Sequence, residues 1–340
     1  MCGDLSLQFN LNCGDRNGSQ LVTRYVIRRL LIIPPALLII HFLGFAYAHI
    51  ARPIRAARTP YVRELVDPTP VWEAYIQHIK NIISGDLGLI PGGQGQFWEA
   101  LLRTTIASVG LLAIALVISI IFGLILGSRA VRTTPPGIAR WLTVFSSFGL
   151  AVPSFYLGSL FILAMVFYVL WMGPGSDAPL PTKGFGWDKH LVFPVLALAL
   201  HPTVVIALVV AESFSGEMRK RYVIAARSFG HTLNNIRWRQ VLFNVLATII
   251  LTIAGSFRLL VGELIVVEWL FNWPGLGNLL ASALVPGTLS SSLGSTPLFM
   301  NPPVVAIVVT IFAAMFLLTD LVASVAVRII DPRLKPSQEG

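Results

Sequence analysis

Six long apolar runs, separated by polar segments, constrain the fold of this sequence more than any other feature. A run of about 20 apolar residues is the length that an α-helix needs to cross the hydrocarbon core of a bilayer. Only 12% of the 340 residues are charged, about half of the roughly 25% found in soluble domains. The sequence therefore predicts an all-α polytopic membrane protein with six transmembrane helices. It excludes an ordinary soluble enzyme, a disordered chain and a fibrous protein.

The ends of the apolar runs divide the chain. We expect a tail at 1–23, a first span at 24–50, a long connection at 51–103, a five-span core at 104–328 and a second tail at 329–340. Within the core, the remaining spans are expected near 105–126, within 142–171, and near 191–211, 241–267 and 304–327, with a polar loop at 212–240.

The long connection carries a pattern of its own. Thr69 is a capping residue, Pro70 suits a first helical turn, and apolar residues follow at helical spacing. These residues are Trp72, Ile76, Ile79 and Ile83. The pattern predicts a short amphipathic helix, which would form a small helical cap between spans one and two.

The basic residues indicate an orientation. If the N-terminus is cytoplasmic, the four cytoplasmic segments hold 16 Lys and Arg residues, counting Arg24, Arg28, Arg29 and Arg328 at the cytoplasmic ends of the first and last spans, and the three outer segments hold 8. Because cytoplasmic loops are enriched in Lys and Arg, both termini are expected in the cytoplasm and the connection at 51–103 outside. This bias also explains the net charge of +9, so nucleic acid is not an expected partner and membrane lipid is.

No residue pattern in this sequence indicates a catalytic, nucleotide-binding or metal-binding site. A phosphate-binding loop needs a Gly-Lys-Ser/Thr sequence, yet none of the five lysines follows a glycine or precedes Ser or Thr. The two cysteines, Cys2 and Cys13, have no further ligand pattern nearby, and the six histidines are scattered. The sequence predicts no bound metal, no cofactor and no catalytic residue.

The polar loop at 212–240 contains a short amphipathic stretch. Tyr222, Val223, Ala226 and Phe229 fall on one side of a short helix, and Gly230 suits its end. Basic residues flank the stretch on both sides. Periodicity alone leaves two interpretations open: a helix lying on anionic lipid, or a helix that docks into a groove of a soluble partner.

Spans three and five contain unusual residues. Pro153 lies inside the third run, where it is expected to bend the spanning helix. The fifth run contains Arg258 and Glu263, with Glu268 at its outer end. Ionisable residues at membrane depth are costly and face a cavity or a partner. Since five residues turn a helix by about 140°, Arg258 and Glu263 are not expected to pair with each other. We expect these four residues to line a translocation path or a subunit interface.

Two longer segments resemble a known family. Tyr222-Val-Ile-Ala-Ala-Arg-Ser-Phe-Gly230 resembles the EAA loop of ABC importer permeases. Trp269-Leu-Phe-Asn-Trp-Pro-Gly-Leu-Gly277 is similar to the segment after span five in the dipeptide, oligopeptide and nickel group. Five shorter pieces agree and keep their order: Arg24-Tyr-Val-Ile-Arg-Arg-Leu30, Gly85-Asp-Leu-Gly88, Val152-Pro-Ser-Phe-Tyr-Leu-Gly158, His190-Leu-Val-Phe-Pro194 and Asp331-Pro-Arg333. The chain resembles the first, B-type membrane subunit of such importers.

The resemblance implies a fold and partners. It implies a type I permease in the prokaryotic inner membrane, paired with a second homologous permease subunit and served by an extracytoplasmic substrate-binding protein. Two ATPase subunits would hold ATP and Mg, so this chain would itself be non-catalytic. The cargo would be peptides, nickel or related solutes.

The resemblance also implies roles for individual residues. The residues that would couple the permease to an ATPase are Tyr222, Ala225, Ala226, Phe229 and Gly230. Ile224 occupies the position where the motif has Glu. The family fingerprint loop contains Trp273, Pro274, Gly275 and Gly277.

The leading alternative is a self-contained secondary transporter or channel. Such folds often contain repeated halves with interrupted helices at matching places, and no internal repeat is evident in this sequence. An intramembrane hydrolase is the third possibility, and it lacks a recognisable nucleophile and base.

Overall fold

A computed structural model describes residues 15–56, 69–85, 97–133, 136–173, 176–284 and 300–330. Some sequence predictions lie outside these described residues. They concern most of the two tails, with both cysteines and the Asp331-Pro-Arg333 motif, and parts of the long connection, including most of Gly85-Asp-Leu-Gly88.

Six helical stretches are long and apolar enough to cross a membrane, which confirms the predicted number of spans. They are built on α1 (Asp15–Ala56), α3 (Phe97–Ala130), α5 (Ser154–Met172), α6 (Val192–Glu217), α9 (Leu242–Phe271) and α11 (Pro302–Ile330). The shorter helices are α2 (Val71–Ile83), α4 (Arg140–Ala151), α7 (Arg221–Ser228), α8 (Leu233–Ile236) and α10 (Leu276–Leu284). A hairpin of β1 (Val131–Thr133) and β2 (Pro136–Ile138) joins α3 to α4, with Val131 opposite Ile138.

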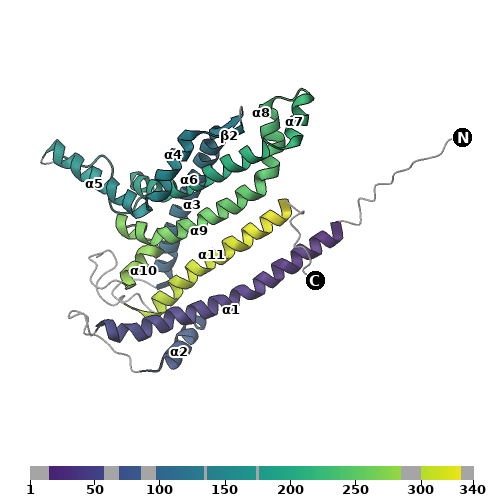
Figure 1. Cartoon of the computed structure of the whole chain (residues 1–340). Coiled ribbons are helices and arrows are strands. Elements are labelled where there is room, and N and C mark those ends of the chain that lie inside the picture. The colour runs from purple at the N-terminus through teal and green to yellow at the C-terminus, as the bar shows by residue number, and fades with distance from the viewer. Residues whose placement is uncertain are drawn as a thin grey trace.

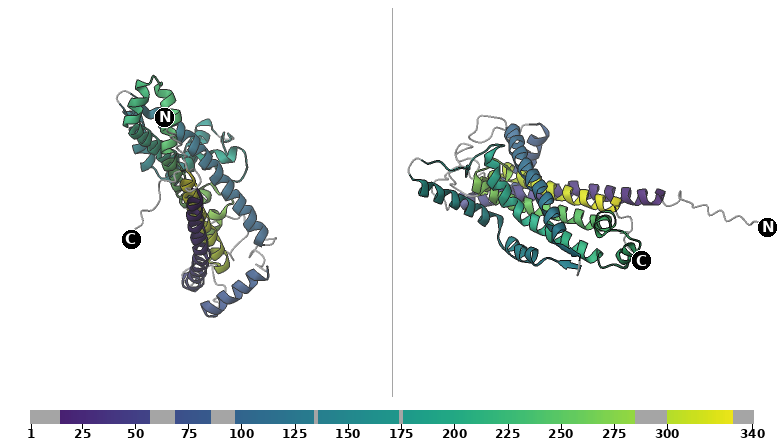
Figure 2. Two further views of the ribbon diagram at one scale, coloured as in Figure 1. Left: turned by 90° about the vertical axis from the view of Figure 1, so that its right-hand side faces the viewer. Right: turned by 90° about the horizontal axis from the view of Figure 1, so that it is seen from above.

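The long helices lie side by side in the order α1, α11, α9, α6 and α3 (Figure 1). Figure 2 shows α1 running along one side of this bundle with α11 against it. The hairpin, α7, α8, the start of α1 and the end of α11 gather at one end, called here the α7 end. The α10 end holds α2, α10 and the end of α1 (Figure 1).

Small residues let the long helices approach closely. A side chain added at Gly127 of α3 would lie 2.5 Å from the carbonyl oxygen of Ala207 in α6. Nearby, the Ser119 hydroxyl donates a hydrogen bond to the Ala199 carbonyl at 3.1 Å. At the α1–α11 contact, a Cβ at Gly44 would lie 3.2 Å from Ala306 Cα. Close backbone approach at small residues is typical of helix packing in membranes.

The third span differs from the expected single bent helix. It is two helices, α4 and α5, separated by extended backbone at Val152 (ψ 112°) and Pro153 (ψ 150°). Proline disfavours the helical conformation of the residue before it and donates no backbone hydrogen bond, so it ends α4 rather than bending it. The break leaves Ser154 at the start of α5.

Large apolar side chains cover the outside of the bundle. Leu31 on α1 is 69% exposed, and Leu170 and Trp171 on α5 are 70% and 90% exposed. A water-soluble surface rarely gathers so many large apolar side chains. Among the described residues, the inside holds two large apolar cores, one toward each end, and the core at the α7 end includes Val223 and Ala226 of α7. A third, smaller cluster of Phe45, Tyr75 and Ala306 joins α1, α2 and α11.

Candidate functional site

The short helix α7 is anchored to the bundle by one of its faces. Val223 and Ala226 are buried in the core at the α7 end. The Tyr222 hydroxyl donates a hydrogen bond to Glu217 Oε2 at 2.9 Å and accepts one from Asn244 Nδ2 at 3.3 Å. Partial burial raises the pKa of Tyr222, so the hydroxyl keeps its proton. The helix is therefore held in one orientation.

The other side of α7 is uncovered in this chain and mixes apolar residues with Arg221, Arg227 and Ser228. Ile224 is 65% exposed, Phe229 is 83% exposed, and Ala225 is exposed between them. We call these three residues the docking face. Gly230 ends the segment with φ +85°, a conformation that side-chain-bearing residues rarely adopt, and it leaves Phe229 projecting at the end of the helix.

The structure divides the residues that the EAA resemblance grouped together. Ala225 and Phe229 lie on the docking face, whereas Tyr222 and Ala226 contact the rest of this chain. Ile224 departs from the motif, yet its side chain is 65% exposed on the docking face. The replacement of the motif's charged Glu by an apolar residue is the sequence signal that could have identified Ile224.

The fingerprint loop after α9 is tightly packed. The Trp273 side chain is fully buried and donates from Nε1 to the Ala107 carbonyl at 3.1 Å. The rings of Phe185 and Trp187 meet it edge-on, with centroids 4.8 Å and 5.8 Å away. The loop thereby joins α3, α9 and the segment before α6.

Glu268 lies beneath this loop and is fully buried. Its carboxylate accepts hydrogen bonds from Ser108 Oγ at 2.6 Å and from the backbone N–H groups of Gly277 at 2.7 Å and Asn278 at 3.2 Å. Those N–H groups belong to the first turn of α10, where a negative charge is favourable. A side chain at Gly275 would collide with the same carboxylate. The sequence predicted that Glu268 lines a path or an interface, whereas in this structure its hydrogen bonds are to Ser108, Gly277 and Asn278 of the same chain.

Arg258 and Glu263 contact neighbouring helices rather than each other. Arg258 Nη1 donates to Asp320 Oδ1 of α11 at 3.0 Å, and Arg29 of α1 pairs with the other oxygen of that carboxylate. Asp320 was missed, although an acid inside the apolar run of the last span carries the same signal as Arg258. Glu263 Oε1 lies 3.7 Å from His201 Nδ1 of α6.

Pro153 precedes Ser154, which lies near the pair of Glu263 and His201. The break at Pro153 places the buried Ser154, the first residue of α5, near Glu263, whose Oε2 is buried without a hydrogen-bond partner among the described residues. A polar cluster from α5, α6 and α9 thus lies inside the bundle at the interruption of the third span.

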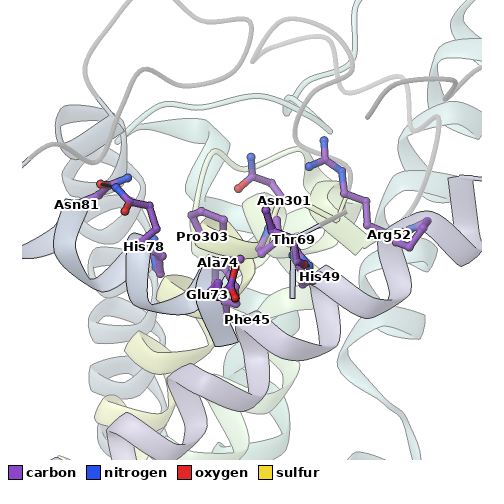
Figure 3. A pocket seen from close by; sticks show the side chains of 13 residues that line it. Phe45, His49, Arg52, Thr69, Glu73, Ala74, His78, Asn81, Asn301 and Pro303 are labelled. Carbon is purple, nitrogen blue, oxygen red and sulfur yellow. Dashed lines mark hydrogen bonds between the residues drawn. The ribbon is translucent and has the colours of Figure 1, made fainter. Parts of the chain in front are cut away.

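A polar pocket lies at the α10 end, between α1, α2 and the start of α11 (Figure 3). Its volume is about 460 Å³, and its lining includes His49, Arg52, Glu73, Asn81 and Asn301. His49 Nε2 donates to the Thr69 carbonyl at 3.1 Å.

The contact of α2 with α1 lies next to this pocket. The His78 ring stacks on His41, with centroids 5.3 Å apart. Burial, with a smaller contribution from His41, lowers the pKa of His78 to about 4. His78 is therefore neutral near pH 7 and joins the apolar contact between the two helices. Within the described ranges, no three His, Cys, Asp or Glu side chains gather as a metal site would require.

Comparison with known proteins identifies the family. Residues 119–336, more than half of the chain, match the family described as "Binding-protein-dependent transport system inner membrane component". The chain belongs to this family. The permease prediction drawn from the EAA-like segment and the fingerprint loop is therefore confirmed.

Curated relatives cover almost the whole length of this permease. The glutathione transport system permease protein GsiC of Escherichia coli (strain K12) is 27% identical over 322 residues, covering 92% of this chain and 98% of the relative. The oligopeptide transport system permease protein AppB of Bacillus subtilis (strain 168) is 26% identical over 330 residues, covering 92% and 99%. The chain is thus a multi-pass membrane component of a binding-protein-dependent ABC importer of the peptide group.

Proposed function

We propose that this permease forms half of a translocation pathway for peptides. A second, homologous permease subunit forms the other half, and an extracytoplasmic binding protein delivers the cargo. Two ATPase subunits hold ATP and Mg and supply the energy, while this chain is non-catalytic. The relatives support peptide cargo, since one is named for oligopeptide transport and one for glutathione, which is a tripeptide.

The docking face is the observation that carries the proposed coupling. Exposed aliphatic and aromatic side chains beside basic residues, on a short and firmly anchored helix, fit a groove on a partner protein, where a few such anchors supply most of the binding energy. Because Val223 and Ala226 fix α7 to the core of the α7 end, a movement imposed on Phe229 is passed to the start of α9. We assign this role to Ile224, Ala225, Phe229 and Gly230.

Charge and geometry together support an orientation with the α7 end in the cytoplasm. The start of α1, the end of α11 and α7 share one end of the bundle (Figure 1), and the Lys and Arg bias favours that end as the cytoplasmic one. In this orientation α2 and the pocket of Figure 3 are extracytoplasmic. The docking face then meets ATPase subunits in the cytoplasm, and the binding protein approaches the α10 end.

Uptake by reconstituted proteoliposomes tests the proposal. Vesicles with this permease, the second permease subunit and both ATPase subunits should accumulate trialanine when ATP is supplied on the side of the ATPase subunits and the binding protein on the opposite side. Vesicles with this chain alone should accumulate none, with or without an ion gradient. ATP-independent uptake by this chain alone would show a self-contained transporter and contradict the proposal.

A further inference from the structure

The short helix α2 has an exposed apolar stripe beside the face that packs on α1. Trp72, Ile76 and Ile83 are 63%, 37% and 80% exposed, and we call them the α2 stripe. With 100° per residue, they lie within about 40° of one another around the helix. Tyr75 and His78 are buried on the adjoining face, against α1. The described part of the chain leaves the α2 stripe uncovered.

Polar residues follow the α2 stripe around the helix. Glu73, Gln77 and Asn81 are exposed and line the polar pocket of Figure 3. They lie about 100° to 180° around the helix from Trp72. Lys80 is exposed between the two groups, at about 80°. An apolar stripe beside a polar one is typical of a helix that lies at a membrane surface.

The helix α2 lies across α1 (Figure 1). The rings of Trp72 and Tyr75 meet the Phe42 ring, with centroids 6.4 Å and 5.0 Å away. The His78 ring stacks on Phe45, with centroids 5.1 Å apart. Nearly two turns of α2 thus meet a single turn of α1. Because α1 is a spanning helix, a helix that crosses it runs along the membrane surface rather than through the bilayer.

The crossing lies at the depth of an interfacial helix. Arg52 is the first charged residue of α1 after Arg29, and a charged side chain at the end of a span belongs at the level of the lipid headgroups. Phe45 precedes Arg52 by seven residues, a rise of roughly 10 Å at 1.5 Å per residue. Interfacial helices bury their apolar face about 5–10 Å into the boundary between headgroups and acyl chains.

The α2 stripe also continues an apolar surface of the first span. Trp72 packs edge-on against Phe42, and Leu38 and Ile39, one turn earlier on α1, are each 60% exposed. Tryptophan is enriched where acyl chains meet headgroups. The position of Trp72 beside these exposed side chains of a spanning helix favours lipid over a protein partner as the cover of the α2 stripe.

We propose that α2 is an interfacial helix in the membrane leaflet at the α10 end, with the α2 stripe in contact with lipid acyl chains. Its polar residues then face the water and form one wall of the pocket in Figure 3. Lys80, at the edge of the α2 stripe, reaches the lipid phosphates with its ammonium group. This inference goes beyond the proposed transport function and holds for any cargo.

Spin labels on α2 test this proposal in the complete transporter. Ile83→Cys or Asn81→Cys is introduced into a chain whose Cys2 and Cys13 are replaced by serine, then labelled and reconstituted into proteoliposomes. Collisions of the label with oxygen, which concentrates in lipid, and with a water-soluble nickel chelate are measured. The ratio of the oxygen rate to the chelate rate should be several-fold higher at position 83 than at position 81.

Two results would overturn the proposal. Equal ratios at the two positions, with both open to the nickel chelate, would place the α2 stripe in water. Protection of position 83 from both probes would show that the binding protein or the second permease subunit covers it. If a label at position 83 prevents assembly, Ile76→Cys reports on the same stripe, with the same results decisive. Uptake is not part of this readout, so a failure of the proposed transport function would leave it unchanged.

Discussion

Replacing Phe229 with aspartate should leave a transporter that inserts and hydrolyses ATP but moves cargo at least tenfold more slowly than wild type. Phe229 lies on the docking face and is 83% exposed, and an aromatic anchor of this kind typically contributes about 2 kcal/mol or more to an interface. A carboxylate in its place would lose that contact and would have to be desolvated in an apolar groove. ATP hydrolysis and uptake are measured in the same proteoliposomes.

Phe229→Leu is the matched control. It keeps an apolar side chain at the same exposed position and should retain most of the uptake. Because Phe229 contributes nothing to the buried core, neither variant should change the yield or melting temperature of the purified chain. Normal uptake by Phe229→Asp would contradict the coupling role of α7.

Replacing Glu268 with alanine should destabilise the chain by about 3 kcal/mol or more. The change leaves the Gly277 and Asn278 N–H groups and the Ser108 hydroxyl without their carboxylate acceptor in a fully buried site, and each unsatisfied buried group costs about 1–3 kcal/mol. The loop around Trp273 and the start of α10 should loosen together. Thermal melting in detergent and the yield of monodisperse protein measure the effect.

Glu268→Gln provides a matched comparison. Glutamine keeps the length of the side chain and one acceptor oxygen for the N–H groups of Gly277 and Asn278, while its amide N–H can donate to Ser108 Oγ. We expect a clearly smaller loss than for alanine. Equal stability of Glu268→Ala and wild type would show that this buried carboxylate does not hold the loop.

Much of the fold could be predicted from sequence because the membrane imposes a simple rule. Each run of about 20 apolar residues becomes a spanning helix, and this rule located all six. The extents of the helices were less predictable: α1 continues to Asp15 and Ala56, beyond its apolar run. The helix break at Pro153 was identified as a bend, since sequence does not reveal whether neighbours restore the lost hydrogen bonds.

The contacts of individual site residues could be predicted only in part. The EAA-like segment was found from its residue pattern, but the anchored and uncovered faces of α7 depend on how it meets α6 and α9. Ala226 faces inward and Ile224 outward for that reason. Glu268 was grouped with Arg258 because both interrupt one apolar run, yet the carboxylate turns toward the first turn of α10. The pairing of Asp320 with two arginines depends on the order of α1, α11 and α9.

Cross-linking from position 229 is the most direct test of whether a separate ATPase subunit binds this permease at α7. Phe229→Cys is introduced into a chain whose Cys2 and Cys13 are replaced by serine, and the assembled transporter in inside-out vesicles is treated with a short reagent that joins this thiol to a lysine amine of a neighbouring subunit. An adduct with an ATPase subunit that blocks uptake is the expected result. Labelling of the introduced thiol only from the outer surface, or normal uptake with no ATPase adduct, would contradict it.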